Sequence, residues 1–348
     1  MTQPYVRVND LKVAFSTEDG VVRAVDGVTF DVERGKTLAI VGESGSGKSV
    51  TSQAIMGLLN RKTTQMSGEV WLGDTEMVSA KDDVLRAKRG TEIAMIFQDP
   101  FASLHPFYRI GNQLVEAVRA HSDVSKADAR AKAEHMLAEV GIPNPDRRLD
   151  DYPHQLSGGM RQRVMIAMAL INGPAVLIAD EPTTALDVTV QAQIMELLSR
   201  LQEEYDTAII LITHDLGVVA DVADEVAVMY AGRIVERGGL DDIFYRPQMP
   251  YTVGLLSSVP RLGTVAERLI PIPGQPPSLI RLPQGCRFEP RCAAKHLVPG
   301  DACRTVQPDL LPTADDPGHL VRCHLDEAAR AAYSQQRLLE ATSTGGAA

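Results

Sequence analysis

Residues 42–49 form a short loop, Gly-Glu-Ser-Gly-Ser-Gly-Lys-Ser, in which three glycines precede a lysine and a hydroxyl. Glycines allow successive backbone N–H groups to converge on phosphate oxygens, because no side chain stands in the way. Lys48 can then reach the β and γ phosphates, and Ser49 offers an oxygen to Mg²⁺. A flexible glycine loop is the alternative interpretation, but the combination predicts a site for ATP and Mg²⁺. The predicted contacts are Gly42, Ser44, Gly45, Ser46, Gly47, Lys48, Ser49 and Val50.

Two adjacent carboxylates, Asp180 and Glu181, follow the apolar run at 176–179. At the end of a buried strand they would lie beside the glycine loop. Asp180 then suits the Mg²⁺ shell, and Glu181 can orient or deprotonate the water that attacks the γ phosphate. Taken alone, such a pair is more often a solvated acidic strand end, but the phosphate loop upstream favours the catalytic interpretation.

Three apolar runs, at 36–41, 175–179 and 207–213, have the length of buried strands and alternate with stretches of helical character. This order is typical of an α/β fold with a mainly parallel sheet covered on both faces. The first run leads through the glycine loop into a predicted helix at 48–59, whose positive N-terminal end favours bound phosphate. These elements would bring the loop and the carboxylates together.

Helical patterns predominate over about 99–173, which predicts a helical insertion. One helix is predicted at 110–121. The next is predicted at 125–140, with Ser125 as its N-cap and Gly141 as its stop signal. The insertion interrupts the α/β pattern between the loop and the carboxylates.

Two short strands, at 225–230 and 233–236, flank an Ala-Gly turn and predict a hairpin that closes a first domain, 1–245. The composition then changes, since 13 of the 21 prolines follow Gly239. We therefore expect a separate, loop-rich region at 246–330.

The chain end has a third composition. A polar helix is predicted from about Asp326, and 331–348 is expected to be a flexible tail that ends in STSTGGAA.

Bulk composition excludes several classes of protein. A length of 348 residues suggests about two domains. The formal net charge of −10 works against binding along a phosphate backbone, so no nucleic-acid partner is expected. The N-terminus lacks a secretory signal pattern, and no uninterrupted apolar run reaches about 18 residues. We expect a cytosolic polypeptide whose attachment to a membrane comes through another protein.

Residues 156–163, Leu-Ser-Gly-Gly-Met-Arg-Gln-Arg, predict a helix N-terminus capped by Ser157, with Gly158 and Gly159 exposing backbone N–H groups. This run resembles the signature motif of ABC ATPases, except that Met160 stands where Gln is usual. The resemblance implies an ABC-type P-loop fold: a RecA-like core with an antiparallel β portion and a helical subdomain. In that family the signature loop contacts ATP held by the opposite subunit, which implies a head-to-tail dimer.

Other landmarks of the ABC family follow in the expected order. The resemblance implies that Phe15 stacks on adenine, although an aromatic residue near a strand is more often part of the core. It implies that Gln98 senses the γ phosphate and Mg²⁺, and that Asp187, in Ala185-Leu-Asp187, lies near the nucleotide. His214 would hydrogen-bond the γ phosphate and position the water of Glu181; alone, it would more often be structural.

Three further segments, at 98–106, 249–256 and 272–277, look like the ATPases of oligopeptide/dipeptide permeases. His105 and Met249 depart from the usual Asn and His. The resemblance implies an ATPase subunit at the cytoplasmic face of the membrane that energises peptide import. Its expected partners are a second ATPase subunit, paralogous or identical, two transmembrane permease subunits docked near 98–107, and an extracytoplasmic substrate-binding protein. Nickel or another small solute is the alternative cargo.

Four cysteines are separated by 5, 10 and 19 residues within the proline-rich region: Cys286, Cys292, Cys303 and Cys323. A cytosolic protein is not expected to pair them as disulfides, but four thiolates can bind Zn²⁺ or an iron–sulfur cluster. Spacing alone does not choose between these. The permease resemblance implies a [4Fe-4S] cluster, with zinc as the second choice and free thiols as the third.

Two rival functions predict other features. A soluble ABC ATPase of translation or DNA repair would carry a tandem cassette or a basic surface, and the sequence has neither. An iron–sulfur regulatory module would need a redox-linked output from the cysteine region, which lies outside the nucleotide motifs.

Overall fold

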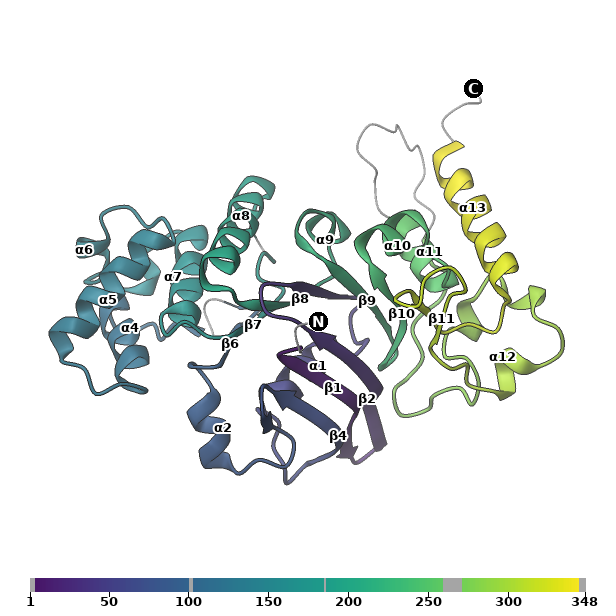
Figure 1. Ribbon diagram of the computed structural model, residues 1–348, viewed down its shortest axis with the longest axis horizontal. Coiled ribbons are helices and arrows are strands. Elements are labelled where there is room, and N and C mark those ends of the chain that lie inside the picture. The colour runs from purple at the N-terminus through teal and green to yellow at the C-terminus, as the bar shows by residue number, and fades with distance from the viewer. Residues whose placement is uncertain (1–3, 100–102, 185, 259–270, 344–348) are drawn as a thin grey trace.

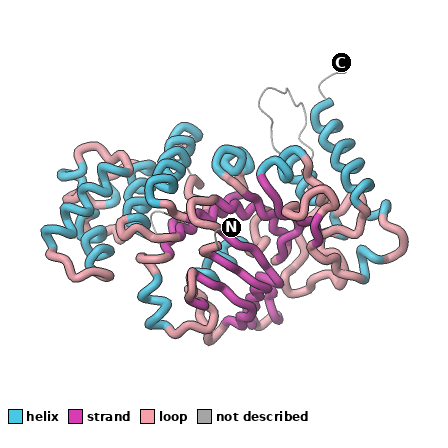
Figure 2. Tube along the Cα trace, in the orientation of Figure 1, coloured by secondary structure: helices cyan, strands magenta, loops and turns pink. Residues whose placement is uncertain are grey.

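The computed structural model describes residues 4–99, 103–184, 186–258 and 271–343. Its strands form two sheets. A group of helices lies at one end of the molecule and the C-terminal region at the other (Figure 1). Strands occupy the middle of the molecule, between the helical end and the loop-rich end (Figure 2). This arrangement confirms the predicted α/β fold with an antiparallel portion and a helical subdomain.

The smaller sheet is antiparallel and lies toward the N-terminus of the chain. Its strands, in spatial order, are β2 (Gly20–Val32), β1 (Val6–Thr17), β4 (Thr64–Leu72) and β5 (Thr75–Glu76). Buried and exposed residues alternate along much of β1, since one face of the sheet packs on the core. The sheet covers one face of the larger sheet.

The larger sheet is mixed. Its strands, in spatial order, are β11 (Leu311–Pro312), β12 (Leu320–Val321), β10 (Arg233–Gly239), β9 (Glu225–Tyr230), β3 (Thr37–Val41), β8 (Ala208–Thr213), β7 (Val176–Asp180) and β6 (Ile93–Ile96). The five strands from β9 to β6 are parallel, and the register pairs Val41 with Thr213 and Asp180 with Ile212. The three apolar runs and the predicted hairpin are confirmed.

The helices follow the predicted distribution. They are α1 (Lys48–Ile55), α2 (Asp82–Lys88), α4 (Ile110–Arg119), α5 (Lys126–Glu139), α6 (Pro145–Arg148), α7 (Gly158–Leu170), α8 (Val188–Tyr205), α9 (Leu216–Val222), α10 (Leu240–Tyr245), α11 (Pro250–Ser257), α12 (Ala302–Thr305) and α13 (Glu327–Ser343), with 3₁₀ turns at Pro153–Gln155, Glu289–Arg291 and Lys295–Leu297. Ser125 caps α5, and Gly141 follows it with a φ of 75°. Helix α1 ends before the predicted residue 59, because Gly57 adopts a φ of 63° that an α-helix cannot continue.

Neighbouring residues of the central strands enter different cores, because side chains alternate across a strand. Ile210 and Ile212 of β8 pack with the antiparallel sheet and α1. Ile209 and Leu211 of the same strand pack with the helices α4, α5, α7 and α8. All residues of β3, β6, β7 and β8 are buried, as expected for a sheet covered on both faces. Their polar carboxyl ends are therefore held by a rigid core.

The C-terminal region shares both its sheet and its core with the rest of the chain. Strand β12 pairs with β10, and Phe288 and Val321 pack in one cluster with Val41 of β3. The predicted composition boundary near residue 245 is thus crossed by continuous packing.

The chain end differs from the flexible tail expected at 331–348. Helix α13 continues to Ser343, in agreement with the polar helix predicted from about Asp326. Its side chains Arg330 and Ser334 are buried, and Arg330 donates to Gln248 at 3.0 Å. This packing, which polarity alone does not reveal, holds the helix against the region around α11. Residues 344–348 lie outside the described part.

Candidate active site

Four parallel strands deliver the predicted site residues at their carboxyl ends. Strand β3 leads into the glycine loop, β7 ends at Asp180, β8 leads into His214, and Gln98 follows β6 closely. Because parallel strands end at the same edge of a sheet, these residues gather there.

The glycine loop is pressed against neighbouring backbone. A Cβ on Gly42 would lie 2.1 Å from the carbonyl oxygen of Met229, and one on Gly47 would lie 2.3 Å from that of Ala24. Gly42 and Gly47 also have φ values of 150° and 108°. Glycine is therefore required at both positions for close approach and for backbone conformation.

Lys48 is folded back into the loop at the start of α1. Its Nζ donates to the carbonyl oxygens of Gly42, at 2.8 Å, and Glu43, at 3.1 Å. The residue is buried, and burial lowers the pKa of its ammonium group, while the nearby carboxylates of Glu181 and Asp180 act in the opposite direction. The ammonium is thus held inside the loop as a preformed cationic centre.

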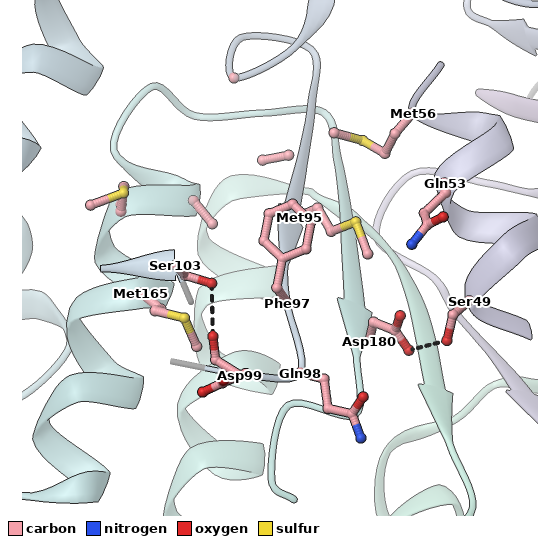
Figure 3. A pocket seen from close by; sticks show the side chains of 14 residues that line it. Ser49, Gln53, Met56, Met95, Phe97, Gln98, Asp99, Ser103, Met165 and Asp180 are labelled. Carbon is pink, nitrogen blue, oxygen red and sulfur yellow. Dashed lines mark hydrogen bonds between the residues drawn. The ribbon is translucent and has the colours of Figure 1, made fainter. Parts of the chain in front are cut away.

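Ser49, the second residue of α1, meets Asp180 at the end of β7. The hydroxyl of Ser49 donates to Oδ1 of Asp180 at 3.2 Å, as the dashed line in Figure 3 marks. Asp180 is buried, and this burial raises the pKa of its carboxyl group, with the Ser49 bond opposing it. A hydroxyl and a carboxylate in contact form the oxygen-rich ligand pair that Mg²⁺ prefers.

Glu181 lies one residue beyond the strand in a left-handed conformation, with a φ of 48°. Gln98 donates to its Oε2 at 2.8 Å, and Thr184 donates to the same oxygen at 3.0 Å. Nδ1 of His214 lies 3.2 Å from Oε1. The structure therefore brings Gln98, Glu181 and His214 into one hydrogen-bonded group. Thr184 is an additional member that the sequence did not single out.

A pocket of about 660 Å³ opens beside this group. It is bounded by Ser49 and Gln53 of α1, Phe97 and Gln98 after β6, and Met165 of α7 (Figure 3). Phe97 remains 42% exposed. The pocket therefore has the polar Ser49–Asp180 pair at one end and an apolar wall on the side of the helical subdomain.

The signature run covers the turn before α7 and the first residues of that helix. The hydroxyl of Ser157 accepts the N–H of Met160 at 3.3 Å, so Ser157 is the N-cap that the sequence predicts. A Cβ on Gly159 would lie 2.9 Å from Val190, and Gly158 faces Leu186. Met160 is half-buried against the core of the helical subdomain.

The remaining predicted site residues lie elsewhere. Asp187 caps α8 by accepting the N–H of Val190 at 3.0 Å, and Val50 packs half-buried on the core beneath α1. Phe15 lies on β1, half-buried against the same core. Ala185 and the residues 100–102 of the 98–106 segment lie outside the described part of the chain.

Glu43 is a member of the loop whose partners the sequence does not reveal. Its carboxylate forms two parallel bonds with Arg291, Nη1 to Oε2 at 2.6 Å and Nη2 to Oε1 at 2.9 Å. Its N–H donates to the hydroxyl of Tyr251 at 2.9 Å. Arg291 stands 248 positions away in the chain, so no local pattern predicts the contact.

The four cysteines are free thiols, half-buried and close to one another without forming a closed metal site. Among the described residues, no three His, Cys, Asp or Glu side chains are arranged closely enough to hold a metal ion. The predicted cluster site is therefore not confirmed. The N–H of Cys286 donates to the carbonyl of Cys303 at 2.8 Å, and Cys292 and Cys323 share an apolar cluster with Cys303. Burial raises the pKa of Cys286 to about 11 and that of Cys292 to about 12, and the neighbouring cysteines add to both shifts.

None of the helices in the described part of the chain combines the length and the apolar composition that crossing a membrane requires.

Comparison with known proteins agrees with this geometry. The family model described as ABC transporter matches residues 25–184, and the model described as the C-terminal region of oligopeptide/dipeptide transporters matches residues 235–297. The dipeptide transport ATP-binding protein DppD of Bacillus subtilis is 52% identical over 321 residues, which cover 92% of this chain and 94% of that protein. The oligopeptide transport ATP-binding protein OppD of Salmonella typhimurium is 53% identical over 287 residues, covering 82% of this chain and 85% of that protein.

A solved structure supports the same assignment. The dimeric structure of MJ0796, a bacterial ABC transporter cassette, matches with a TM-score of 0.61 and 28% identity, covering 68% of this chain and 98% of that one. The chain therefore belongs to the family of ATP-binding subunits of ABC transporters, in its oligopeptide/dipeptide branch.

Proposed function

We propose that this subunit hydrolyses ATP at the glycine loop to drive import of peptides through a membrane ABC transporter. The observation that carries the proposal is the convergence of Lys48, the Ser49–Asp180 pair and the Gln98–Glu181–His214 group at one edge of the sheet. Such a group supplies a phosphate cradle, metal ligands and a base for water.

Each residue takes a distinct role in this proposal. The loop from Gly42 to Val50 holds the phosphates, with Lys48 on the β and γ oxygens. Ser49, Asp180 and Gln98 hold Mg²⁺. Glu181 orients and deprotonates the attacking water, and His214 hydrogen-bonds the γ phosphate. Phe15 would stack on adenine, and Asp187 would lie near the nucleotide of the dimer.

A second ATPase subunit completes the site. Ser157, Gly158 and Gly159 form a capped helix N-terminus, which favours an anion, yet Ser157 caps its own helix rather than joining the Lys48 group. The similarity to a dimeric cassette supports a head-to-tail dimer, with a paralogue or a second copy, in which this N-terminus meets the opposite γ phosphate. Ser157→Arg should abolish hydrolysis in the assembled transporter while the subunit still binds ATP. Normal hydrolysis by this variant would contradict the dimer.

The apolar wall of the pocket beside Gln98 is the proposed docking site for the membrane subunits. Phe107 is 82% exposed and Tyr108 is 56% exposed, close in sequence to the exposed Phe97 on the pocket wall. Exposed aromatic side chains beside an apolar pocket are typical of protein interfaces. Docking of two permease subunits there would hold this chain at the cytoplasmic face of the membrane, with an extracytoplasmic binding protein delivering the cargo. Phe107→Ser together with Tyr108→Ser should release the subunit from the membrane fraction, and unchanged sedimentation would contradict the docking site.

Peptide cargo rests on the two relatives named for dipeptide and oligopeptide transport. The test is uptake of a radiolabelled di- or tetrapeptide by cells that carry the complete transporter. Peptide uptake should stop in the Glu181→Gln variant, which blocks ATP hydrolysis while the subunit stays in the complex. Saturable, Glu181-dependent uptake of nickel without peptide uptake would instead identify the alternative cargo.

We also propose that the four cysteines of the 246–330 region ligate a [4Fe-4S] cluster, with Zn²⁺ as the second choice. Thiolates fit either group. Cys292, Cys303 and Cys323 pack against one small apolar cluster that includes residues of α13, and Cys286 packs with Cys292 and Cys323 against the neighbouring larger cluster. Side-chain rotation and local closure would be needed to bring them into ligand positions. Protein purified without oxygen should show broad visible absorbance with about four irons per chain, and Cys292→Ser should remove it. One zinc ion per chain, without visible absorbance, would identify a zinc site. The absence of both iron and zinc would refute the site.

The division into a nucleotide-binding domain at 1–245, with its helical subdomain at about 99–173, and a C-terminal region at 246–330 is retained as part of this proposal. The separate family match at residues 235–297, which begins ten residues before the proposed boundary, supports a distinct C-terminal region.

A further inference from the structure

Glu43 of the glycine loop forms hydrogen bonds with the side chains of three other residues. Its carboxylate binds Arg291, its N–H donates to Tyr251, and its carbonyl accepts from Lys48 at 3.1 Å. Two of these contacts come from the C-terminal region, and the third fixes the ammonium group of Lys48, which the proposed function assigns to phosphate binding. The peptide unit at Glu43 therefore links the C-terminal region directly to Lys48.

Arg291 is itself tightly held. Its side chain is only 4% exposed, and its Nε donates to the carbonyl of Pro273 at 2.9 Å. Nη1 lies 3.4 Å from the hydroxyl of Tyr230, and the hydrogen bond to Glu43 raises the Arg291 pKa further. A planar guanidinium that binds both oxygens of a carboxylate sets its orientation as well as its position, which an ammonium group cannot do.

Three aromatic side chains pack together beside the contact between Glu43 and Arg291. The rings of Tyr230 and Tyr251 are 4.5 Å apart, and Phe288 lies 5.3 Å from each of them. These rings come from β9, from α11 and from the loop that precedes Arg291. The clamp on Glu43 therefore rests on side chains that are locked by packing, so it cannot relax without disturbing a core.

We propose that Arg291 is a positioning residue for ATP binding, through which the C-terminal region sets the shape of the phosphate loop. By fixing Glu43, Arg291 holds the carbonyl that anchors Lys48 and keeps the loop open around the phosphates. This inference deepens the proposed function, since it rests on ATP binding at the loop. It assigns the C-terminal region a direct role in nucleotide affinity.

The same region also contains an arginine that serves as a contrast. Arg322 immediately precedes Cys323, as Arg291 precedes Cys292, and it is half-buried with donors to the carbonyls of Ile234 and Pro308. Burial lowers the pKa of Arg322 to about 10. It contacts β10 and the C-terminal region but makes no described hydrogen bond to the loop at 42–49, so it is a matched control for general packing.

The experiment measures ATP affinity, by equilibrium binding, and ATPase kinetics of the assembled transporter. Glu43→Gln and Arg291→Gln should each raise the Kd and KM for ATP at least about tenfold, because a loop displaced by a fraction of an ångström loses its alignment with the phosphates. At saturating ATP the kcat should stay within about threefold of wild type, since Glu181 and His214 are untouched. Arg291→Lys keeps the charge but not the paired bonds, so its Kd and KM should lie between those of wild type and Arg291→Gln.

A double variant separates positioning from general destabilisation. If Arg291 acts through Glu43, Glu43→Gln combined with Arg291→Gln should raise Kd no further than either change alone. Arg322→Gln should leave Kd unchanged even if it lowers Tm. Should Arg291→Gln fail to fold, Glu43→Gln still tests the clamp, because its backbone contacts with Tyr251 and Lys48 remain.

Failure of the positioning role of Arg291 can be distinguished from failure of the proposed function. Unchanged Kd in Glu43→Gln, fully additive effects in the double variant, or an equal rise in Kd in Arg322→Gln would overturn the positioning role. Lys48→Ala provides the separate reference: loss of ATP binding in that variant keeps the proposed function, whatever happens at Arg291, whereas normal binding would refute the function itself.

Discussion

The imidazole Nδ1 of His214 lies 3.2 Å from Oε1 of Glu181, so the residue that follows β8 touches the carboxylate that follows β7. Gln98 holds the other oxygen of the same carboxylate at 2.8 Å. His214 is exposed, with 63% of its side chain accessible, while Glu181 is only 18% exposed. The carboxylate is thus oriented from two sides, and His214 retains an open ring edge that a γ phosphate could meet.

His214→Ala should slow ATP hydrolysis about 100-fold, because one preorganised hydrogen-bond donor to the developing phosphate charge is removed. The ATP Kd should change by less than about threefold, since Lys48 and the loop are intact. Phosphate release and equilibrium ATP binding measure the two quantities. His135→Ala is the matched control, because His135 is an exposed histidine of the helical subdomain. Hydrolysis at the wild-type rate in His214→Ala would remove it from its assigned role.

Asp180→Asn should raise the Mg²⁺ concentration needed for half-maximal hydrolysis by about tenfold or more, because the loss of even an outer-shell partner lowers metal affinity by that much. Burial raises the pKa of Asp180, so protons compete with Mg²⁺ more effectively than at an exposed carboxylate. The Mg²⁺ requirement of the wild type should therefore increase as the pH falls, and this dependence should be weaker in the variant. A Mg²⁺ titration at several pH values measures both effects. Asp83→Asn, an exposed change on α2, should alter neither, and identical Mg²⁺ curves for Asp180→Asn and wild type would contradict the assignment.

Asp26 on β2 should make stability depend on pH. Burial would raise its pKa, but hydrogen bonds and charge from Arg233 and Arg287 outweigh burial and lower it. A carboxyl group with a lowered folded pKa stabilises the fold above its ordinary pKa, and the contribution is lost as the pH falls through the lowered value. Asp26→Asn should therefore lower the free energy of unfolding at neutral pH by about 3 kcal/mol.

Denaturant unfolding across the acidic range checks this prediction. The difference between wild type and Asp26→Asn should shrink as the pH falls below the ordinary carboxyl pKa. Asp10→Asn in the same sheet should cost little at any pH, because the side chain of Asp10 is 67% exposed and pairs with exposed Lys12. A pH-independent difference would show that the Asp26 charge is not responsible.

The nucleotide site could be predicted from sequence because its residues follow strongly patterned elements. Lys48, Asp180 and His214 each stand at the carboxyl end of a buried strand or directly after the loop that leaves one. Apolar runs of strand length mark such ends locally, and parallel strands bring them to one edge without further information. Helix α1 is shorter than its sequence pattern predicts, because the conformation of Gly57 depends on the backbone around it.

The remaining features depend on contacts between distant parts of the chain. The pairing of Glu43 with Arg291 joins positions 248 residues apart, and the left-handed backbone of Glu181 is imposed by its surroundings rather than by residue type. Helix α13 likewise packs on distant parts of the chain, through buried Arg330 and Ser334 and through apolar contacts of Tyr333. No local periodicity encodes these contacts. The arrangement of the four cysteines also depends on how their loops pack, which spacing does not determine.

The most direct test compares ATP retention and phosphate release by the transporter assembled with either Glu181→Gln or Lys48→Ala. Glu181→Gln should retain uncleaved ATP while hydrolysis falls at least about 100-fold, and Lys48→Ala should retain none. Wild-type phosphate release by Glu181→Gln, or undiminished ATP retention by Lys48→Ala, would contradict the proposed function.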